Sequence, residues 1–126
     1  MPKSILVVDD AAFMRRLLRD VLTEAGYQVH EAVSGEDAVE KYVEVRPDLV
    51  TMDLGMPGMG GLAAIERIRA ADEHARVVVV SAVASDEVVD RALALGASAY
   101  LRKPFQPAAA LDTVRKSLLV PPASRC

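Results

Sequence analysis

Five polar side chains of this sequence share one property, which is that each stands at the end of a short apolar run. They are Asp9, Asp10, Asp53, Ser81 and Lys103. Unit charges about 5 Å apart repel by about 3 kcal/mol at an effective dielectric near 20, so carboxylates that meet at one place favour a bound cation. Oxygen ligands without His or Cys select a hard ion, and a few carboxylates with water suit Mg²⁺ better than Ca²⁺.

The chemistry that such a set could perform is phosphoryl transfer. A carboxylate beside a divalent cation can attack a phosphoryl group without a base and become an aspartyl phosphate. The lysine ammonium would neutralise the transferred oxygens, and the serine hydroxyl would donate a hydrogen bond to them. His30 and His74 fall away from these positions, so we expect both at the surface and neither as a phosphate carrier.

Each of these residues also has an ordinary interpretation when it is taken alone. Asp9 or Asp10 could cap a helix, and Asp53 could belong to a turn. The serine could be a loop hydroxyl, the lysine a solvated surface group, and Tyr100 a core residue with its hydroxyl in water. Because the polar residues end four different apolar runs, we favour one common site.

The elements that must position this set are five short strands. The sequence predicts strands over residues 4–8, 28–32, 48–52, 76–80 and 98–102. Runs that are apolar on both faces are typical of strands in a parallel sheet that is covered on each side. The carboxyl ends of parallel strands meet at one edge, where ligands bind. The second strand ends in Ala32 and Val33 and brings no reactive group.

Segments of helical period separate the strands. In the first, apolar residues fall at positions 14, 17, 18, 21, 22 and 25, and Gly26 ends it. The second begins near Ser34, where Asp37 completes a capping-box pattern, and it ends before Pro47. Apolar residues at positions 62, 65 and 68 mark the third.

The last two helices have recognisable boundaries. Ser85 is the predicted cap of the fourth and Gly96 its terminator. We expect its positions 88, 89, 92 and 93 to face inward and the helix to be short on charge. Pro107 opens the fifth helix, where its missing N–H costs nothing. The alternation predicts an α/β fold, a doubly wound five-stranded parallel sheet with helices on both faces.

Composition excludes several classes of function. The 126 residues fit one domain, with a core at 3–119 and a tail at 120–126. A net charge of −3 and 4% aromatic residues argue against a nucleic-acid partner. The lone Cys126 allows no internal disulfide. No apolar run approaches the ~20 residues of a membrane span and no signal peptide is evident, so we expect a cytoplasmic monomer that contacts no membrane.

Four motifs resemble, in order and spacing, the receiver domains of two-component response regulators. They are residues 7–10, 52–57, 81–82 and 103–105. The likeness extends over residues 3–119, and residues 9–15 and 103–107 are similar to the stand-alone chemotaxis regulators of thermophilic bacteria. The resemblance implies the strand order 2-1-3-4-5 that is known for flavodoxin-like sheets.

The resemblance also implies the roles of the acidic residues. Asp53 would accept a phosphoryl group from a phosphohistidine of a sensor histidine kinase. Asp10, Asp53 and the backbone carbonyl of Gly55 would hold Mg²⁺, with Asp9 bound mostly through water. The protein would catalyse only its own phosphorylation and dephosphorylation and would not otherwise be an enzyme.

The remaining motif residues would form the switch. By the same resemblance, Lys103 would pair with the phosphoryl oxygens, and the peptide bond between Lys103 and Pro104 would be cis. Ser81 would bond to the phosphoryl group, and Tyr100 would turn inward in response. Helix four, strand five and helix five would then carry the output. The implied partners are a chemotaxis histidine kinase, the flagellar motor switch and a phosphatase.

One position departs from the family pattern, and more than one function stays open. The family usually has Asp or Asn where this chain has Gly60, so the third helix should have a weaker cap and the loop at 55–61 more freedom. That loop could instead be a phosphate cradle, although the chain has no GxxxxGK pattern. The chain could also be a phosphorelay intermediate, a Mg²⁺-dependent phosphatase, which would need polar groups where Gly55 and Val83 stand, or a flavin-binding module.

Overall fold

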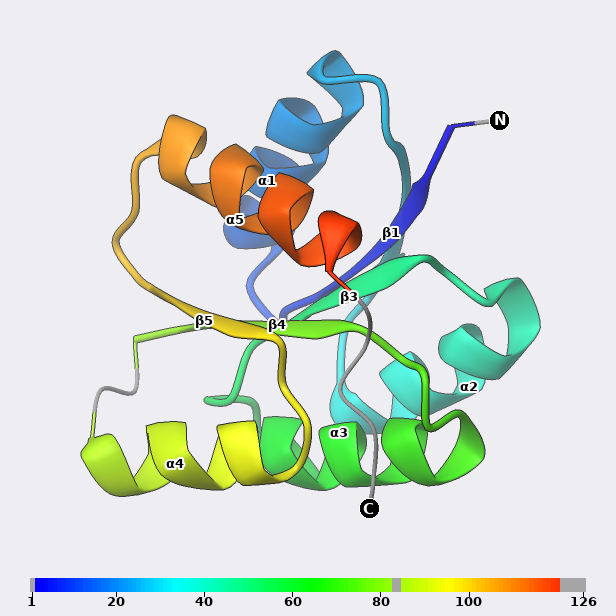
Figure 1. The fold of residues 1–126 in the computed structure, drawn as a ribbon, viewed down its shortest axis with the longest axis vertical. Helices are drawn as coiled ribbons and strands as arrows, with labels where there is room; N and C mark the ends of the chain where they lie inside the picture. Colours follow the sequence, from blue (N-terminus) through cyan, green and yellow to red (C-terminus); the bar gives the residue numbers. More distant parts are fainter. Residues whose placement is uncertain (1, 83–84, 121–126) are drawn as a thin grey trace.

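The computed structural model describes residues 2–82 and 85–120 of the chain. At its centre is a parallel sheet that two layers of helices enclose (Figure 1). The strands are β1 (Ser4–Val8), β2 (Gln28–Ala32), β3 (Leu49–Met52), β4 (Val77–Ser81) and β5 (Ala99–Arg102). They lie in the order β2-β1-β3-β4-β5, so the predicted α/β fold and its strand order are confirmed.

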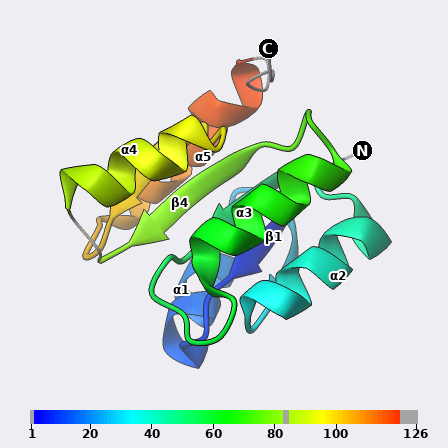
Figure 2. The same cartoon turned by 90° about the horizontal axis from the view of Figure 1, so that it is seen from below.

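Two helices cover one face of the sheet and three cover the other. α1 (Ala12–Glu24) and α5 (Pro107–Leu119) lie above the sheet in Figure 1. α2 (Gly35–Val45), α3 (Gly60–Ala71) and α4 (Asp86–Ala94) lie below it, and Figure 2 shows α3 between the other two. Within the described residues, no helix combines the length and the apolar character that a membrane crossing requires.

The alternation of side chains along the strands divides the core into two clusters. Leu6 and Val8 of β1 pack with side chains of α2, α3 and α4. Ile5 and Val7 of the same strand pack on the opposite face with side chains of α1 and α5. Because both faces of the sheet are covered, the central strands carry nearly continuous apolar runs instead of an apolar residue at every second position.

The strands begin and end within one residue of their predicted bounds. β4 runs to Ser81, so the serine is its last residue and not the residue that follows it. β3 leaves out Asp48, because the carboxylate of Asp48 accepts a 2.7 Å hydrogen bond from the backbone N–H of Ser4. The carboxyl ends of β1, β3 and β5, which matter most for the site, lie where the sequence predicted them.

Two of the predicted helix caps are confirmed. The hydroxyl of Ser34 accepts a hydrogen bond from the backbone N–H of Asp37 at 3.1 Å, and that of Ser85 accepts one from Val88 at 3.3 Å. The predicted capping box is only half formed, because the Asp37 carboxylate accepts from the N–H of Val33 at 3.0 Å instead of from Ser34.

Within the described residues, neither the first nor the third helix has a side-chain cap, which excludes the ordinary interpretation of Asp9 and agrees with the weaker cap expected for the third helix. α1 follows Ala11, and among the described residues no side chain caps it. Asp9, which could have been that cap, accepts a hydrogen bond from the N–H of Ala11, one residue before the helix. α3 begins at Gly60 itself, with φ of +76°, and Met59 stands at the cap position.

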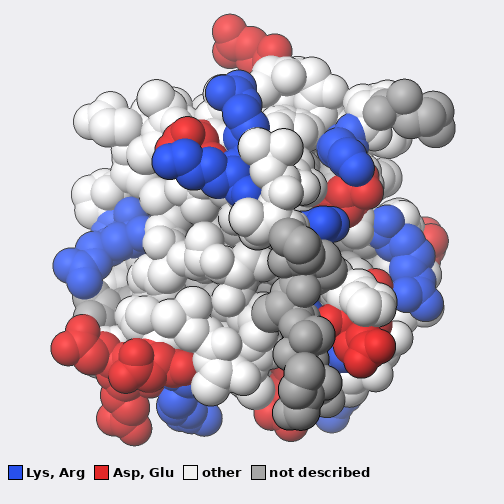
Figure 3. All heavy atoms as spheres, viewed as in Figure 1, with Lys and Arg blue, Asp and Glu red and all other residues white. Residues whose placement is uncertain are grey.

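The expectations for α4 need correction in two respects. Leu93 does not face inward, since 47% of its surface is exposed. The helix is also not short on charge, because Asp86, Glu87 and Asp90 are all exposed. Figure 3 shows acidic side chains gathered over the start of α4, at the lower left of the view.

Tyr42 joins α2 to the end of α3. Its hydroxyl donates a 2.8 Å hydrogen bond to the carboxylate of Asp72, the residue that caps the end of α3. Burial, together with this carboxylate, raises the pKa of Tyr42 well above its ordinary value. Burial also acts to raise the pKa of Asp72, but the hydrogen bonds from Tyr42 and from the backbone of His74 outweigh it and hold that pKa below its ordinary value. The pair keeps these two helices in a fixed arrangement.

The buried side chain of Arg69 in α3 lies against the turn between α4 and β5. It is 1% exposed, and its Nη1 donates a 2.9 Å hydrogen bond to the carbonyl oxygen of Ala75. Gly96, in that turn, has φ of +102°, and a Cβ there would lie 2.6 Å from Nε of Arg69. Gly26, which follows α1, has a similar φ of +99°, but a Cβ there would meet nothing within 4 Å.

Alanine at each of these glycines separates backbone strain from contact with Arg69. Both substitutions force an L residue into the left-handed region, at a cost of about 1–2 kcal/mol. Gly96→Ala also overpacks the arginine, so we expect it to lower the free energy of unfolding by at least about 1 kcal/mol more than Gly26→Ala does. Urea unfolding followed by circular dichroism measures the difference, and equal losses would contradict the packing argument.

Candidate functional site

β1 ends in a buried carboxylate that backbone contacts hold in place. Asp9 is 1% exposed, and its Oδ1 accepts a 2.9 Å hydrogen bond from the N–H of Ala11. The guanidinium of Arg15 donates to the Asp9 carbonyl oxygen at 2.8 Å and pairs with Glu31 of β2 at 3.2 Å. Asp10, the next residue, is exposed. The acidic pair therefore presents one enclosed and one accessible carboxylate.

Asp53 occupies the same edge of the sheet, directly after β3. Its backbone N–H donates a 3.0 Å hydrogen bond to the carbonyl oxygen of Val8, which continues the pairing between β1 and β3 by one step. The residue is 7% exposed, and Oδ1 accepts a 3.1 Å hydrogen bond from the N–H of Gly55. This local turn fixes the direction of the carboxylate.

Lys103 reaches the acidic residues from the end of β5. Its Nζ lies 2.6 Å from Oδ2 of Asp9 and 3.7 Å from Oδ1 of Asp53. Its backbone N–H donates to the carbonyl oxygen of Ser81 at 3.0 Å, and its peptide bond to Pro104 is cis, as predicted. The side chain is 17% exposed, so the ordinary interpretation of a solvated surface lysine is wrong.

The three carboxylates are close enough to share one cation. One oxygen of each of Asp9, Asp10 and Asp53 lies within 4.8 Å of the others. Within the described residues, the ammonium of Lys103 pairs with this group, and one positive charge beside three carboxylates leaves negative charge in excess. The donor set contains only oxygen atoms, which fits a hard divalent cation such as Mg²⁺. Because Asp10 is exposed, an ion from solvent can reach its carboxylate.

Two further predicted residues lie on neighbouring strands. Ser81 is 1% exposed at the end of β4, so it is not a loop hydroxyl. Tyr100 of β5, paired in register with Val79, packs against the cluster beneath the sheet. Its hydroxyl oxygen is buried and has no hydrogen-bond partner among the described residues, so the interpretation with this hydroxyl in water is wrong.

The other residues named from the sequence lie away from the carboxyl edge of the sheet or outside the described residues. His74 is exposed, whereas His30 is half-buried in β2 and not fully at the surface as expected. Val83, Cys126 and most of the tail at 120–126 lie outside the described residues. Sequence reasoning gave no role to Arg15. An arginine in the first turns of the helix that follows an acidic pair could have indicated a contact with that pair.

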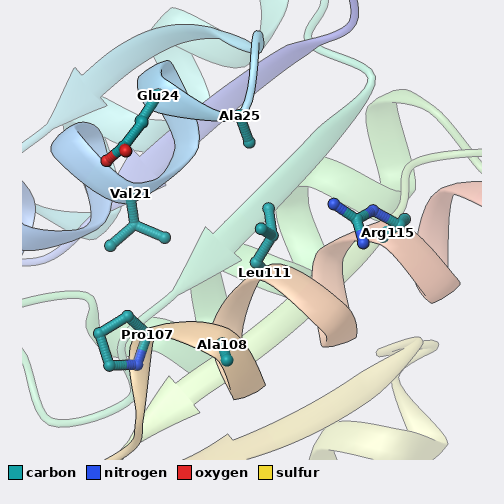
Figure 4. A pocket seen from close by; sticks show the side chains of 7 residues that line it. All are labelled: Val21, Glu24, Ala25, Pro107, Ala108, Leu111 and Arg115. Carbon is teal, nitrogen blue, oxygen red and sulfur yellow. The ribbon is translucent and has the colours of Figure 1, made fainter.

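One groove on the surface lies away from the three carboxylates and Lys103. A cavity of about 400 Å³ lies between α1 and α5 and is lined by Val21, Leu111, Glu24, Arg115 and three smaller side chains (Figure 4). None of these residues belongs to the set that the strand ends bring together. The convergence of charged groups, and not the size of a hollow, therefore locates the site.

Comparison with known proteins agrees with this geometry. The sequence matches the family model of the response regulator receiver domain over residues 5–115. It is 47% identical to the chemotaxis protein CheY of Thermotoga maritima, over 92% of this chain and 98% of that protein. It is 36% identical to sporulation initiation phosphotransferase F of Bacillus subtilis, over 94% of this chain and 95% of that protein.

The fold is also similar to that of a solved CheY structure. A CheX–CheY–BeF3–Mg²⁺ complex from Borrelia burgdorferi matches with a TM-score of 0.91 and 32% sequence identity, covering 95% of this chain and 92% of that one. The family match spans β1 to α5, and the CheY relative overlaps the chain almost from end to end. This chain therefore belongs to the response regulator receiver domain family, whose CheY-like members are signalling regulators.

Proposed function

We propose that this chain is a phosphorylation-controlled switch in chemotaxis, in which Asp53 accepts a phosphoryl group from a sensor histidine kinase. The observation that carries the proposal is the position of the Lys103 ammonium, 2.6 Å from Asp9 and 3.7 Å from Asp53. A cation held there by one carboxylate can turn to the oxygens of a group that the other carboxylate receives. The likeness to CheY proteins supports chemotaxis as the pathway.

The transfer step requires no general base. A carboxylate oxygen of Asp53 forms a bond to phosphorus while the bond from phosphorus to an imidazole nitrogen of the donor histidine breaks. The electron pair of the broken bond returns to that nitrogen, which takes up a proton as it leaves. Lys103 then exchanges part of its contact with Asp9 for one with the phosphoryl oxygens, and the hydroxyl of Ser81 donates a hydrogen bond to another of them.

Magnesium fits the proposed ligands. Asp10, Asp53 and the carbonyl oxygen of Gly55 would bind it directly, with Asp9 acting mostly through water. When bound, the ion supplies positive charge that neutralises the oxygens of the phosphoryl group in transfer. The solved CheY relative that contains Mg²⁺ supports this choice of ion.

Replacement of the acceptor gives the direct test of the proposed function. With acetyl phosphate as donor and Mg²⁺ present, the wild type should gain one phosphoryl group, which mass spectrometry of the intact protein detects. Asp53→Asn should abolish this labelling, because the amide is not a nucleophile, and removal of Mg²⁺ should suppress it. Asp20→Asn, on the exposed surface of α1, is the matched control and should label normally. Continued labelling of Asp53→Asn would show that the acceptor is another residue.

The crowding of carboxylates predicts opposite effects of Asp10→Asn on stability and on metal binding. Without Mg²⁺, removal of one of three neighbouring negative charges should stabilise the fold by about 1 kcal/mol, which raises Tm by a few degrees. Mg²⁺ should raise the Tm of the wild type and have a smaller effect on the variant, which has lost a ligand. A variant less stable than the wild type in the absence of Mg²⁺ would contradict the crowding.

The proposed switch residues are Ser81 and Tyr100. Phosphorylation adds negative charge and strong acceptor oxygens next to Ser81. A bond that Ser81 makes only in the phosphorylated state can shift the population between two states. The buried hydroxyl of Tyr100 supports the switch, because an unpaired buried donor costs about 1–3 kcal/mol. A second arrangement in which this hydroxyl forms a hydrogen bond would recover that free energy.

The face formed by α4, β5 and α5 is the proposed output surface. It adjoins Ser81 and Tyr100, and it exposes Leu93 of α4, the helix whose start carries the acidic side chains seen in Figure 3. The proposed partners are a chemotaxis histidine kinase that supplies the phosphoryl group, a flagellar motor switch protein that reads it and a phosphatase that removes it. The relatives named CheY support this set.

Binding and transfer experiments distinguish a terminal regulator from a relay. The phosphorylated protein should bind a peptide of the motor switch protein at least about tenfold more tightly than the unphosphorylated protein, a difference of about 1.4 kcal/mol. It should transfer little phosphoryl group to a histidine phosphotransfer protein. The reverse pattern would favour the relay, for which the likeness to a sporulation phosphotransferase is the supporting observation. Calorimetry and transfer of radiolabelled phosphate measure the two properties.

A further inference from the structure

The loop between β3 and α3 begins and ends against Asp53. At its start, the N–H of Gly55 bonds Oδ1 of Asp53. At its end, Gly61 lies so close to Asp53 that a Cβ there would fall 2.4 Å from the Asp53 carbonyl oxygen. Both ends of the loop are therefore fixed. The carbonyl of Gly55, a proposed Mg²⁺ ligand, points into the peptide that follows, so its position also depends on how the middle of the loop is held.

The middle of this loop has little internal support. Gly58 and Gly60 have φ of +78° and +76°, in the region that only glycine adopts readily. Met59 stands at the cap position of α3, and no side-chain cap bond is made by it in the described structure. The N–H groups at the start of α3 consequently need an acceptor from another element.

Glu36 of α2 provides this acceptor. Its Oε1 accepts a 2.8 Å hydrogen bond from the backbone N–H of Met59, 23 positions further along the chain. The missing side chain of Gly58 makes room for the contact, because a Cβ there would lie 3.3 Å from Oε1 of Glu36. A carboxylate at the start of a helix also interacts favourably with the helix dipole.

The helix that presents Glu36 is itself held firmly. Ser34 caps its first turn, and Gly35 packs so closely that a Cβ there would lie 3.0 Å from the carbonyl oxygen of Gly60. At its other end, the hydrogen bond from Tyr42 to Asp72 holds α2 against the end of α3. Glu36 therefore projects from a fixed support toward the loop.

We propose that Glu36 is a positioning residue for the Mg²⁺ and phosphoryl site, and that it supplies, from a neighbouring helix, the side-chain acceptor that the start of α3 lacks. The inference rests on the proposed function, because the Gly55 carbonyl matters to affinity only if the loop binds Mg²⁺. The segment after β2 brings no reactive group to the rim, yet it holds the loop that does.

Loss of Glu36 should lower the affinity for Mg²⁺ and should not change the rate of phosphoryl transfer to Asp53. Apparent affinity falls in proportion to the fraction of molecules whose loop is competent to bind. If loss of Glu36 lowers that fraction to about one third, half-saturation needs about three times more Mg²⁺. The groups around Asp53 and Lys103 are untouched, so the rate of phosphorylation at saturating Mg²⁺ should not change.

The experiment is a Mg²⁺ titration of the wild type and of Glu36→Ala, with two readouts. One is the shift of the Gly55 amide signal in ¹H–¹⁵N NMR spectra, and the other is the rate of labelling by acetyl phosphate. Both should show half-saturation at about threefold higher Mg²⁺ in the variant, with an unchanged maximal rate. Circular dichroism establishes that each protein is folded.

Three further variants separate positioning from a general structural effect. Glu36→Gln keeps an acceptor oxygen and should behave nearly as the wild type. Glu40→Ala removes an exposed glutamate one turn further along α2 and should leave Mg²⁺ binding unchanged. Gly60→Asn in the Glu36→Ala background should restore affinity, because asparagine tolerates the left-handed region and a Cβ at this position would meet nothing within 4 Å.

The outcomes distinguish failure of the inference from failure of the function. If the wild type neither binds Mg²⁺ nor becomes labelled, the proposed function fails and the inference fails with it. If the wild type does both, an unchanged half-saturation in Glu36→Ala overturns the inference alone. An equal shift in Glu40→Ala, or no recovery with Gly60→Asn, also overturns it, because either result removes the capping contact as the cause.

Discussion

The arrangement on which the rest of this structure depends is a single ammonium group opposed by three carboxylates. Lys103 pairs with the buried Asp9 and lies near Asp53, while Asp10 completes the acidic group from an exposed position. Excess negative charge is unfavourable unless a cation shares the site, so the fold must hold these groups together against their repulsion. The parallel sheet does this because the carboxyl ends of β1, β3 and β5 meet at one edge, where the buried central strands β1 and β3 hold two of them in place.

Support for this edge comes from the helices as well as from the strands. Arg15 of α1 holds the backbone of Asp9, and Glu36 of α2 holds the loop after Asp53. The first contact is local, because Arg15 bonds the turn that leads into its own helix, whereas the second joins residues 23 positions apart. The glycine-containing loop after Asp53 is thus held by a long-range polar contact from α2.

A buried polar group in β5, two residues before the strand ends, has no partner among the described residues. It is the hydroxyl of Tyr100, whereas Lys103 nearby pairs with Asp9 and lies near Asp53. An unpaired buried donor suits a two-state element, because a second arrangement can relieve it. The proposed switch therefore combines a rigid receiving site with one side chain whose environment is incomplete.

Local pattern in the amino-acid sequence determined the strands, the helix boundaries at Ser34, Ser85 and Pro107, and the residues that end each strand, because apolar period and cap chemistry act over a few positions. Only the tertiary structure decided which partner each polar group takes. Lys103 lies 94 positions from Asp9, and Glu36 lies 23 from Met59, so these contacts exist only once the sheet and its helices have packed. The exposure of Leu93 and the burial of the Tyr100 hydroxyl follow from the same cause, since burial depends on what covers a residue and not on its neighbours in the chain.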